Sequence, residues 1–248
     1  MKTVAVVQAR MGSSRLPGKV LMPVGPVAMV ARVAEAARAA AGVDECWIAC
    51  PEGSADDPIA RLADGIGVAC LRGDEHDVLS RFLAVGRRAG ADRLVRLTAD
   101  CPLLDPDVVG RVIALLGPDS GLDYASNVAP RSFPRGLDVE AMRLEALERI
   151  AREPGPDDRE HVTVTLRTGR GGRFRTATLV ADSDDSDLRW TVDTAEDLAF
   201  VRRLDAAVPM AGRSYRQLVA RCRSDSSLYR ADTAAGTWDP TRSEARAG

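Results

Sequence analysis

The sequence predicts an α/β protein with a single open, mostly parallel sheet flanked by helices. Strand-like and helix-like segments alternate through the first two-thirds of the 248 residues, which is typical of a parallel sheet covered by helices. The opening strand is continuously apolar over Val4–Val7, as expected for a strand buried on both faces. With 45% apolar and 28% charged residues, a chain of this length can bury a core without metal or disulfide support.

The repeating part of the chain supplies four strands and four helices. Apolar, β-rich runs predict strands at Thr3–Gln8, Cys46–Cys50, Val68–Leu71 and Arg93–Leu97. Helical patterns occupy Met29–Ala41, Pro58–Asp64, Val78–Ala89 and a last segment that runs to Leu116. Asp105 before Pro106 supplies an N-cap and a first helical residue for that last helix.

The rhythm changes after Gly117, where shorter segments predict a smaller mixed α+β region. Short strands are expected at Tyr124–Asn127, Leu137–Glu140, Phe174–Val180 and Leu188–Val192, with helices at Leu144–Arg152 and Thr194–Leu204. Thr194, with Asp197 three residues on, caps the second of these helices. The arginine-rich run Arg167–Arg175 is interpreted as a solvated hairpin or turn. We expect one domain over residues 1–222 and a tail over 223–248, either disordered or lying on the body.

Charge and cysteine content exclude several classes of protein. The 34 Lys and Arg residues balance 36 Asp and Glu residues, so nucleic-acid binding is not expected. No apolar run of 18 residues occurs, so no membrane span is expected. Five cysteines without a C-x-x-C pair and two histidines do not make a zinc site. Reduced thiols and the lack of a signal peptide favour the cytoplasm.

The segment that follows the first strand carries the strongest functional signal. Three cations, Arg10, Arg15 and Lys19, lie within ten residues and are separated by glycines and small polar residues. Small residues let backbone N–H groups approach an anion, so the pattern favours a polyphosphate ligand. Five residues separate Gly12 from Gly18, where a Walker A loop has four, and Val20 follows Lys19 in place of Ser or Thr. A Walker A loop is therefore excluded, and no G-x-G-x-x-G occurs either. The alternative is a solvated basic loop.

This segment resembles the A-R-x-G-S-x-R-[LI]-P-x-K signature of the cytidylyltransferases that make CMP-activated sugar acids. It is most similar to the spore-coat polysaccharide biosynthesis protein F group. Four further segments also match the pattern of that group: Thr98–Leu103, Phe133–Asp138, Arg159–Thr163 and Trp190–Thr194. The resemblance implies a nucleotide-diphospho-sugar transferase fold of GT-A type. It also implies CTP-binding residues, which are Ala9, Arg10, Met11, Gly12, Ser13, Ser14, Arg15, Lys19, Asp77, Arg81, Thr98 and Ala99.

Two aspartates are candidates for a Mg²⁺ site. Asp100 ends the fourth strand of the repeat, at the edge of the sheet where ligands bind, and the resemblance makes it a metal ligand. Asp193 matches the second metal aspartate of the family, although Ala195 replaces the proline usual there. The structural alternatives are a turn residue for Asp100 and a solvated helix-end carboxylate for Asp193.

The less regular region, residues 118–185, is expected to bind the acceptor and is the candidate dimer interface. Arginine forks suit an anionic acceptor, and the candidates are Arg131, Arg135, Asp138, Glu160 and His161. His161 is a possible base, acceptor contact or buried core residue, and His76 a possible exposed loop residue.

The predicted activity is a Mg²⁺-dependent cytidylyltransferase reaction. CMP passes from CTP to a sugar acid or small phosphonate, pyrophosphate leaves, and Arg10, Arg15 and Lys19 hold the phosphates. The resemblance implies a homodimer. Two alternatives are a glycosyltransferase of the same fold and a non-catalytic nucleotide-binding protein. No D-x-D metal motif occurs near residue 100, which argues against the glycosyltransferase.

Overall fold

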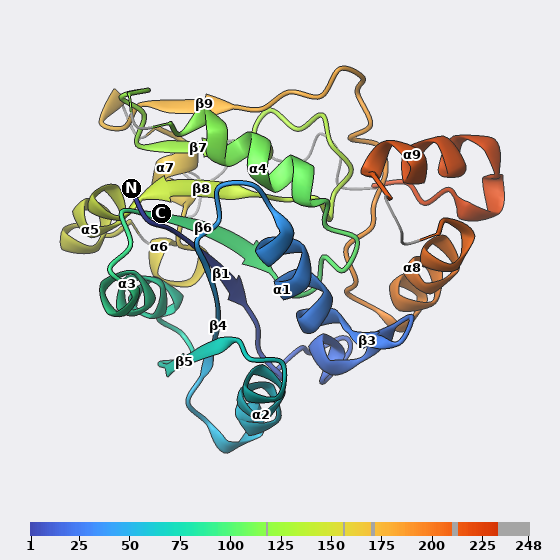
Figure 1. Ribbon diagram of the computed structural model, residues 1–248, viewed down its shortest axis with the longest axis horizontal. Coiled ribbons are helices and arrows are strands. Elements are labelled where there is room, and N and C mark those ends of the chain that lie inside the picture. Colours follow the sequence, from blue (N-terminus) through green and yellow to red (C-terminus); the bar gives the residue numbers. More distant parts are fainter. Residues whose placement is uncertain (118, 156, 170–171, 210–212, 233–248) are drawn as a thin grey trace, which may run out of the picture.

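A computed structural model of the protein shows a seven-stranded sheet in the order β5-β4-β1-β6-β8-β7-β9 (Figure 1). The structure describes residues 1–117, 119–155, 157–169, 172–209 and 213–232. No helix in these ranges is long and apolar enough to cross a membrane. The predicted class is confirmed: the sheet is open, and most of its strand pairs are parallel.

Four parallel strands form the half of the sheet that the sequence predicts best. They are β1 (Thr3–Gln8), β4 (Glu45–Pro51), β5 (Ala69–Gly73) and β6 (Arg93–Thr98). β1 lies between β4 and β6, which explains its continuous apolar run, because both of its faces are covered. Parallel pairing brings the carboxyl ends of β1 and β6 to the same edge, where Gln8 lies beside Thr98.

The other half of the sheet is short and mixed. β8 (Glu140–Arg143) pairs antiparallel with β6 and with β7 (Tyr124–Ser126), and β7 pairs parallel with β9 (Thr176–Thr178). The expected strand over Leu137–Glu140 begins only at its last residue.

The expected strand at Leu188–Val192 is wrong. Leu188, Trp190 and Val192 are each fully buried, and this alternation produced the strand-like pattern. The segment nevertheless belongs to none of the seven strands. It forms two isolated β-bridges, one between Leu188 and Ala231 and one between Arg189 and Arg135. It is extended because it packs between two loops.

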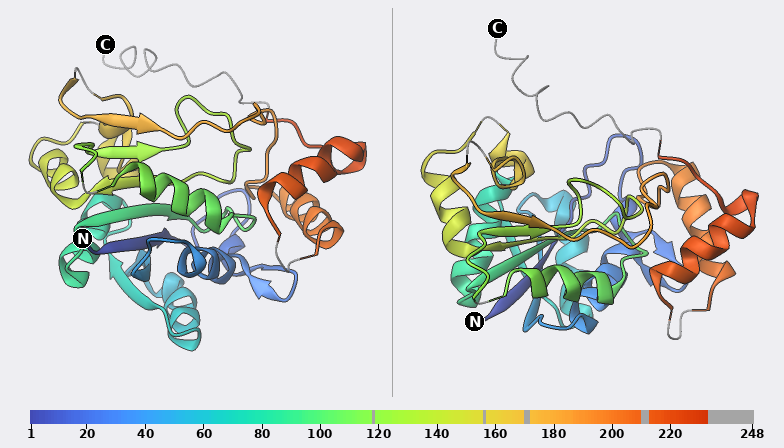
Figure 2. Two further views of the ribbon diagram at one scale, coloured as in Figure 1. Left: turned by 45° about the horizontal axis from the view of Figure 1, so that its top comes forward. Right: turned by 90° about the horizontal axis from the view of Figure 1, so that it is seen from above.

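The helices cover both faces of the sheet. α1 (Met29–Ala39), α2 (Asp57–Gly65) and α4 (Pro106–Leu115) contribute to one hydrophobic cluster, and α3 (Val78–Ala89) and α5 (Leu144–Arg152) to the other. The right view of Figure 2 shows α4 and α5 on opposite sides of the sheet. The remaining elements are η1 (Lys19–Leu21), β2 (Pro23–Val24), β3 (Val27–Ala28), η2 (Ser54–Asp56), α6 (Asp158–His161), α7 (Val164–Arg167), α8 (Ala195–Ala207), α9 (Tyr215–Ser224) and η4 (Ser226–Leu228).

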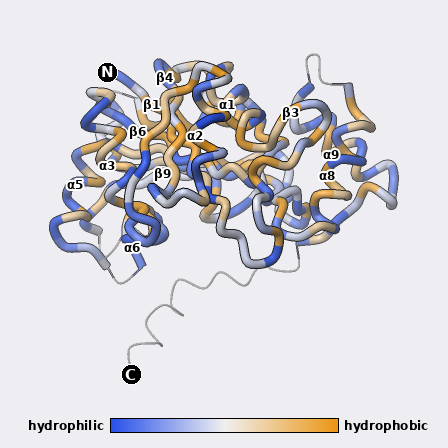
Figure 3. Tube along the Cα trace, turned by 90° about the horizontal axis from the view of Figure 1, so that it is seen from below, coloured by the Kyte–Doolittle hydropathy of each residue, from blue (hydrophilic) through white to orange (hydrophobic). Residues whose placement is uncertain are grey.

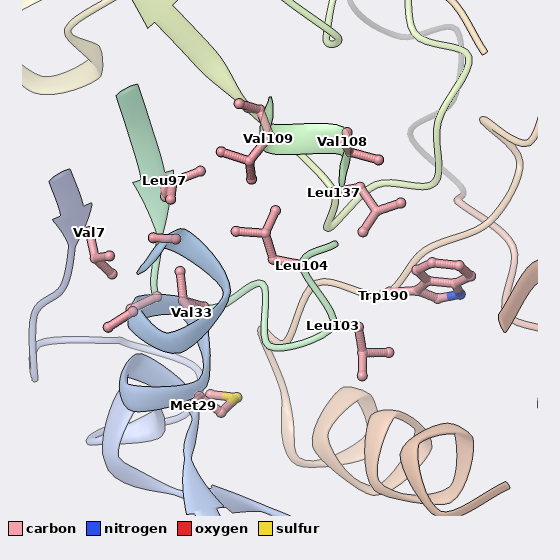
Figure 4. Packing of buried hydrophobic residues seen from close by; sticks show 14 of the residues in the cluster. Val7, Met29, Val33, Leu97, Leu103, Leu104, Val108, Val109, Leu137 and Trp190 are labelled. Carbon is pink, nitrogen blue, oxygen red and sulfur yellow. The ribbon is translucent and has the colours of Figure 1, made fainter. Parts of the chain in front are cut away.

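Side chains of β1 alternate between the two clusters, Val4 and Val6 on one face and Ala5 and Val7 on the other. Figure 4 shows Val33 of α1, Leu97 of β6 and Val108 of α4 around the larger cluster. Figure 3 shows hydrophobic residues gathered along the central strands. This rigid core holds the carboxyl edge of the sheet in place.

Both predicted helix caps are confirmed. The carboxylate of Asp105 accepts a hydrogen bond of 2.8 Å from the N–H of Asp107. Thr194 and Asp197 form a reciprocal capping box at the start of α8.

The carboxyl-terminal part of the described chain is more ordered than the sequence suggests. Sequence patterns missed α9, which lies beside α8 at one end of the molecule (Figure 1). The first residues of the expected tail complete α9 and η4, and Leu228 is buried. Residues 233–248 of that tail lie outside the described residues.

Candidate active site

A cavity of about 320 Å³ lies at the carboxyl ends of β1 and β6. The loop after β1 contributes Ala9, Arg10, Ser13, Ser14, Arg15 and Lys19 to its lining. Met11 and Gly12 are absent from the lining, and Met11 instead fixes the loop by donating its N–H to Asp56 at 2.7 Å. The predicted cationic loop therefore surrounds a hollow at the edge where open α/β sheets bind ligands.

Lys19 is turned into the protein at the end of this loop. Gly18 precedes it with φ of 71°, a backbone conformation that glycine adopts without steric cost. The Lys19 Nζ donates to Asp100 at 2.9 Å, to Asp193 at 3.0 Å and to the carbonyl of Val192 at 2.7 Å. The sequence predicted a cation in this loop but not its contact with both aspartates.

The two aspartates, 93 positions apart in sequence, therefore lie together. Their two oxygens bound to Lys19 are at most 5.9 Å apart, the sum of the Asp100 and Asp193 distances. Burial opposes the charge on Lys19, but the carboxylate of Asp100, with Asp193, outweighs it and raises the Lys19 pKa. Burial likewise opposes the charge of Asp193, yet hydrogen bonding from Lys19 holds the pKa of Asp193 below its ordinary value.

The donor set of Asp100 and Asp193 fits a magnesium ion. Both carboxylates already converge on one cationic centre, the Lys19 ammonium, so their position suits a second cation. Mg²⁺ is bound through one or two carboxylates, with phosphates and water completing the shell. Within the described ranges, no group of three or more His, Cys, Asp or Glu side chains is placed to hold a metal by itself.

A second cavity of about 240 Å³ adjoins the first. The lining residues common to both cavities are Arg96, Thr98, Asp100 and Asp193. The second cavity adds Arg135 and Arg189 to this shared wall. The aspartate pair therefore stands between two hollows, each of which contains arginine side chains.

The five predicted acceptor residues do not gather in one place. Arg135 and Asp138 line the second cavity, whereas Glu160 and His161 line the first. His161 is exposed, so the alternative of a buried core histidine is wrong. Arg131 lines neither cavity.

Arg131 is half-buried and forms a two-point ion pair with Asp138, at 2.6 and 2.7 Å. Burial opposes the charge of Asp138, but the guanidinium of Arg131 outweighs it and holds the Asp138 pKa below its ordinary value. Arg131 thus acts on the second cavity by fixing a carboxylate in its wall.

A buried carboxylate that the sequence did not reveal supports the wall shared by the cavities. Glu140 accepts hydrogen bonds from Tyr124 at 2.6 Å and Thr163 at 2.7 Å, and pairs with Arg96 at 2.5 Å and Arg167 at 3.1 Å. Burial opposes its charge, but Arg96 and Arg167 dominate and lower the Glu140 pKa to about 2.

The interpretation of Arg167 as part of a solvated turn is therefore wrong, because its guanidinium reaches Glu140 in the interior. Arg170, in the same run, lies outside the described residues. A usable signal for this network was Arg96, a charge within an apolar strand.

On the base side of the first cavity, Arg81 is almost fully buried and lines the cavity. It donates to the backbone carbonyls of Asp74 and Glu75 and so holds the loop before α3. Within the described part of the chain its Nε has no hydrogen-bond partner. Asp77 lines neither cavity; it caps α3 through the N–H of Ser80 at 2.9 Å and pairs with Arg159 at 2.5 Å.

The fold, with ligand-sized hollows at its carboxyl edge, is that of the nucleotidyltransferases. A cytidylyltransferase from Leptospira borgpetersenii superposes with a TM-score of 0.88 at 29% identity, over 94% of this chain and 98% of that one. The profile of the cytidylyltransferase family matches residues 4–168. The chain belongs to this family.

Two curated relatives extend the match along the chain. The spore coat polysaccharide biosynthesis protein SpsF of Bacillus subtilis is 32% identical, over 80% of this chain and 84% of that protein. The 3-deoxy-manno-octulosonate cytidylyltransferase of Nitrobacter hamburgensis is 28% identical, over 86% of this chain and 96% of that protein. The predicted resemblance is confirmed, and the protein is a CTP-dependent nucleotidyltransferase.

Proposed function

We propose that the protein transfers CMP from CTP to an anionic acceptor, a sugar acid or a small phosphonate, with release of pyrophosphate. The carrying observation is the position of Asp100 and Asp193 in the wall shared by the two cavities. A transfer reaction needs donor and acceptor in contact at one place, and this wall is where ligands of the two cavities would meet.

The loop after β1 holds the triphosphate in this proposal. Arg10 and Arg15 line the cavity with exposed side chains that can close on phosphate oxygens. Lys19 is fixed in place by three hydrogen bonds, so its charge is already oriented before the ligand binds. A preorganised cation stabilises the charge that develops on the departing pyrophosphate.

Asp100 and Asp193 would hold Mg²⁺, which supplies charge neutralisation and orientation at the phosphates when bound. The carboxylates are held in position by neighbouring cations, with Arg15 3.0 Å from Asp193 and Arg189 paired with its other oxygen. The contact with Arg189 keeps the Asp193 side chain in place if Lys19 moves toward the phosphates.

The base is proposed to lie against Arg81 and the loop before α3. Arg81 retains a buried N–H donor that a ligand can use, and it shapes the loop through carbonyl contacts. Cytosine as the base follows from the family to which the chain belongs.

The acceptor is proposed to occupy the second cavity. Arg135 and Arg189 supply guanidinium groups that suit two-point binding of a carboxylate or phosphonate. A phosphonate attacks through an oxygen that is already ionised at neutral pH and needs no general base, which agrees with a cavity whose described lining has no histidine. A sugar acid attacks through a hydroxyl, whose proton would pass to solvent water. The relative from Nitrobacter hamburgensis takes 3-deoxy-manno-octulosonate, an acceptor of this class.

The division of the chain is also part of the proposal. Residues 1–222 form the nucleotidyltransferase domain, within which 118–185 supply the acceptor side and a homodimer interface. Sedimentation of the purified chain measures the oligomeric state, and a monomer at all concentrations would remove the dimer. The five cysteines are free, as expected for a reducing compartment such as the cytoplasm.

The test of the activity is release of pyrophosphate from CTP in the presence of Mg²⁺ and single acceptors. The panel contains 3-deoxy-manno-octulosonate, other sugar acids and small phosphonates, with neutral sugars as controls. We expect pyrophosphate release with at least one anionic acceptor and with none of the neutral sugars. CTP binding without turnover across the panel, or turnover with neutral sugars alone, would contradict the proposal.

A further inference from the structure

The last described segment of the chain lies against the wall of the second cavity. After η4, the backbone of Arg230 accepts a hydrogen bond from the N–H of Arg189 at 3.0 Å, and Asp232 donates its N–H to Asp187 at 2.6 Å. Leu188 bridges to Ala231 in the same stretch. The segment is thus fixed along residues 187–189 by backbone contacts.

Asp232 points its carboxylate at the two arginines of the second cavity. Its side chain is 1% exposed, lies 2.7 Å from the Nε of Arg135, and lies 4.0 Å from a terminal nitrogen of Arg189. Both arginines line the cavity, whereas Asp232 lies behind them. The buried carboxylate is placed to orient Arg135 directly and to add to the pair with Asp193 that already holds Arg189.

The backbone beneath these arginines is already fixed. The N–H of Arg135 donates to Leu188 at 2.9 Å, and the N–H of Trp190 donates to Arg135 at 2.7 Å. Gly136 follows with φ of 112°, and a Cβ there would lie 2.8 Å from the backbone of Trp190. What remains free is the long arginine side chain, and this is the part that Asp232 holds.

The chemistry of the Arg135 contact matters for ligand binding. Asp232 engages Nε, the inner nitrogen of the guanidinium, so the outer nitrogens keep donors for a second anion. Holding a rotamer-rich side chain before binding reduces the entropy lost when the ligand arrives.

We propose that Asp232 is a positioning residue for acceptor binding, which orients Arg135 and Arg189 for two-point contact with the carboxylate or phosphonate of the acceptor. The inference rests on the proposed function. The family profile ends at residue 168, so Asp232 lies well beyond the matched part of the chain. A carboxyl-terminal segment thereby completes a site that the first strand begins.

The experiment compares the full-length protein with Asp232→Asn, which keeps the size of the side chain and removes its charge. Asp225→Asn is the matched control, because Asp225 lies on the same segment but caps η4 and pairs with Arg221. We expect Asp232→Asn to raise the KM for 3-deoxy-manno-octulosonate or 2-hydroxyethylphosphonate roughly tenfold, the cost of losing an oriented charge-assisted contact. The KM for CTP and the kcat at saturating acceptor should change less than about twofold, within the range of a distant surface change.

A second substitution separates positioning from a general structural role. Because Arg135→Lys removes the fork that Asp232 orients, adding Asp232→Asn to it should raise the acceptor KM little further. Thermal unfolding of each variant shows whether it is folded, and Asp232→Ser replaces Asp232→Asn if the latter is not. An unchanged acceptor KM in Asp232→Asn, or a parallel loss of CTP and acceptor affinity, overturns the inference.

A readout without turnover keeps the inference separate from the proposed function. Phenylglyoxal modifies guanidinium groups, and peptide mass spectrometry measures the rate at each arginine. We expect Asp232→Asn to accelerate modification of Arg135 and Arg189 but not of Arg61 on α2. One result separates the two proposals: CTP binds and these modification rates change, but no acceptor is used. In that case the proposed acceptor class is wrong, while Asp232 still orients the arginines. Unchanged rates overturn the inference in every case.

Discussion

The cavity after β1 takes three of its cations from a single loop of ten residues, whereas the second cavity takes its three arginines from separate segments of the chain. Two of the loop's cations, Arg10 and Arg15, are exposed, and Lys19 is buried against two aspartates. In the second cavity Arg96 pairs with Glu140, and Arg135 and Arg189 pair with Asp232, all distant in sequence; Arg189 also pairs locally with Asp193.

The difference lies in how each cavity becomes rigid. The loop gains rigidity from local backbone contacts, such as the N–H of Gly18 on the carbonyl of Met11 at 3.0 Å, and from distant contacts of Met11 and Lys19, while Arg10 and Arg15 stay exposed. The second cavity gains it from ion pairs between distant residues, with 97 positions separating Arg135 from Asp232. Substitutions in the loop should therefore affect only the interaction with the triphosphate. Substitutions behind the arginines should affect acceptor binding and the stability of the fold.

Lys19→Ala is expected to have the largest effect on activity. Loss of a preoriented cation at the leaving group should lower kcat about 10²–10³-fold. Pyrophosphate release measures the change, and Lys2→Ala, in an exposed pair with Glu45, serves as the control. Activity within threefold of the wild type, in a folded variant, would remove Lys19 from the reaction.

Glu140→Gln is expected to have the largest effect on stability. Arg96 and Arg167 would lose their buried partner, so the free energy of unfolding should fall by about 3 kcal/mol at neutral pH. Urea unfolding measures it, with Glu45→Gln, an exposed carboxylate, as the control. A loss no greater than in the control would show that Glu140 does not support the shared wall.

The same residue predicts a pH dependence. The folded pKa of Glu140 is lowered from 4.5 to about 2, so its stabilising contribution is complete above the unfolded pKa and is lost as pH falls toward 2. The difference in free energy of unfolding between wild type and Glu140→Gln should shrink over this window. A constant difference from pH 6 to pH 2 would be inconsistent with a depressed pKa.

A pair of substitutions tests the division of labour between the cavities. Arg10→Ala should raise the KM for CTP about tenfold and leave the acceptor KM unchanged, because one charge-assisted contact is lost on one side. Arg135→Ala should do the reverse. Arg61→Ala on α2 is the control. If both variants changed both constants equally, the two hollows would act as one site.

The smallest expected effect concerns Asp77, which lies beside the first cavity without lining it. Asp77→Ala removes the N-cap of α3 and should lower the free energy of unfolding by about 1 kcal/mol. Its KM for CTP should change less than twofold. A tenfold rise in that KM would return Asp77 to the nucleotide-binding residues.

The sequence predicted the first cavity better than the second for a physical reason. Local signals, such as alternating strands and helices, the cap at Asp105 and the cations after β1, depend on near neighbours and survive in a linear sequence. The identity of Asp193 as the neighbour of Asp100 came through family resemblance, because two residues 93 positions apart carry no local sign of contact.

The features that were missed depend on distant partners. A buried, extended segment at residues 188–192 resembled a strand because strand periodicity records burial and does not identify the partner. α9 was also missed, although its buried residues Tyr215, Leu218 and Cys222 have helical spacing, because half of its ten residues are polar. Asp232 reads as part of a polar tail until the fold places it beside Arg135.

The position of Asp232 also orders events during protein synthesis. The ribosome makes the cationic loop first and residues 230–232 more than two hundred residues later. A nascent or prematurely terminated chain can thus have its first strand in place while Arg135 still lacks the carboxylate that holds it. Truncation of the chain after residue 229 would then spare the loop and impair the wall of the second cavity.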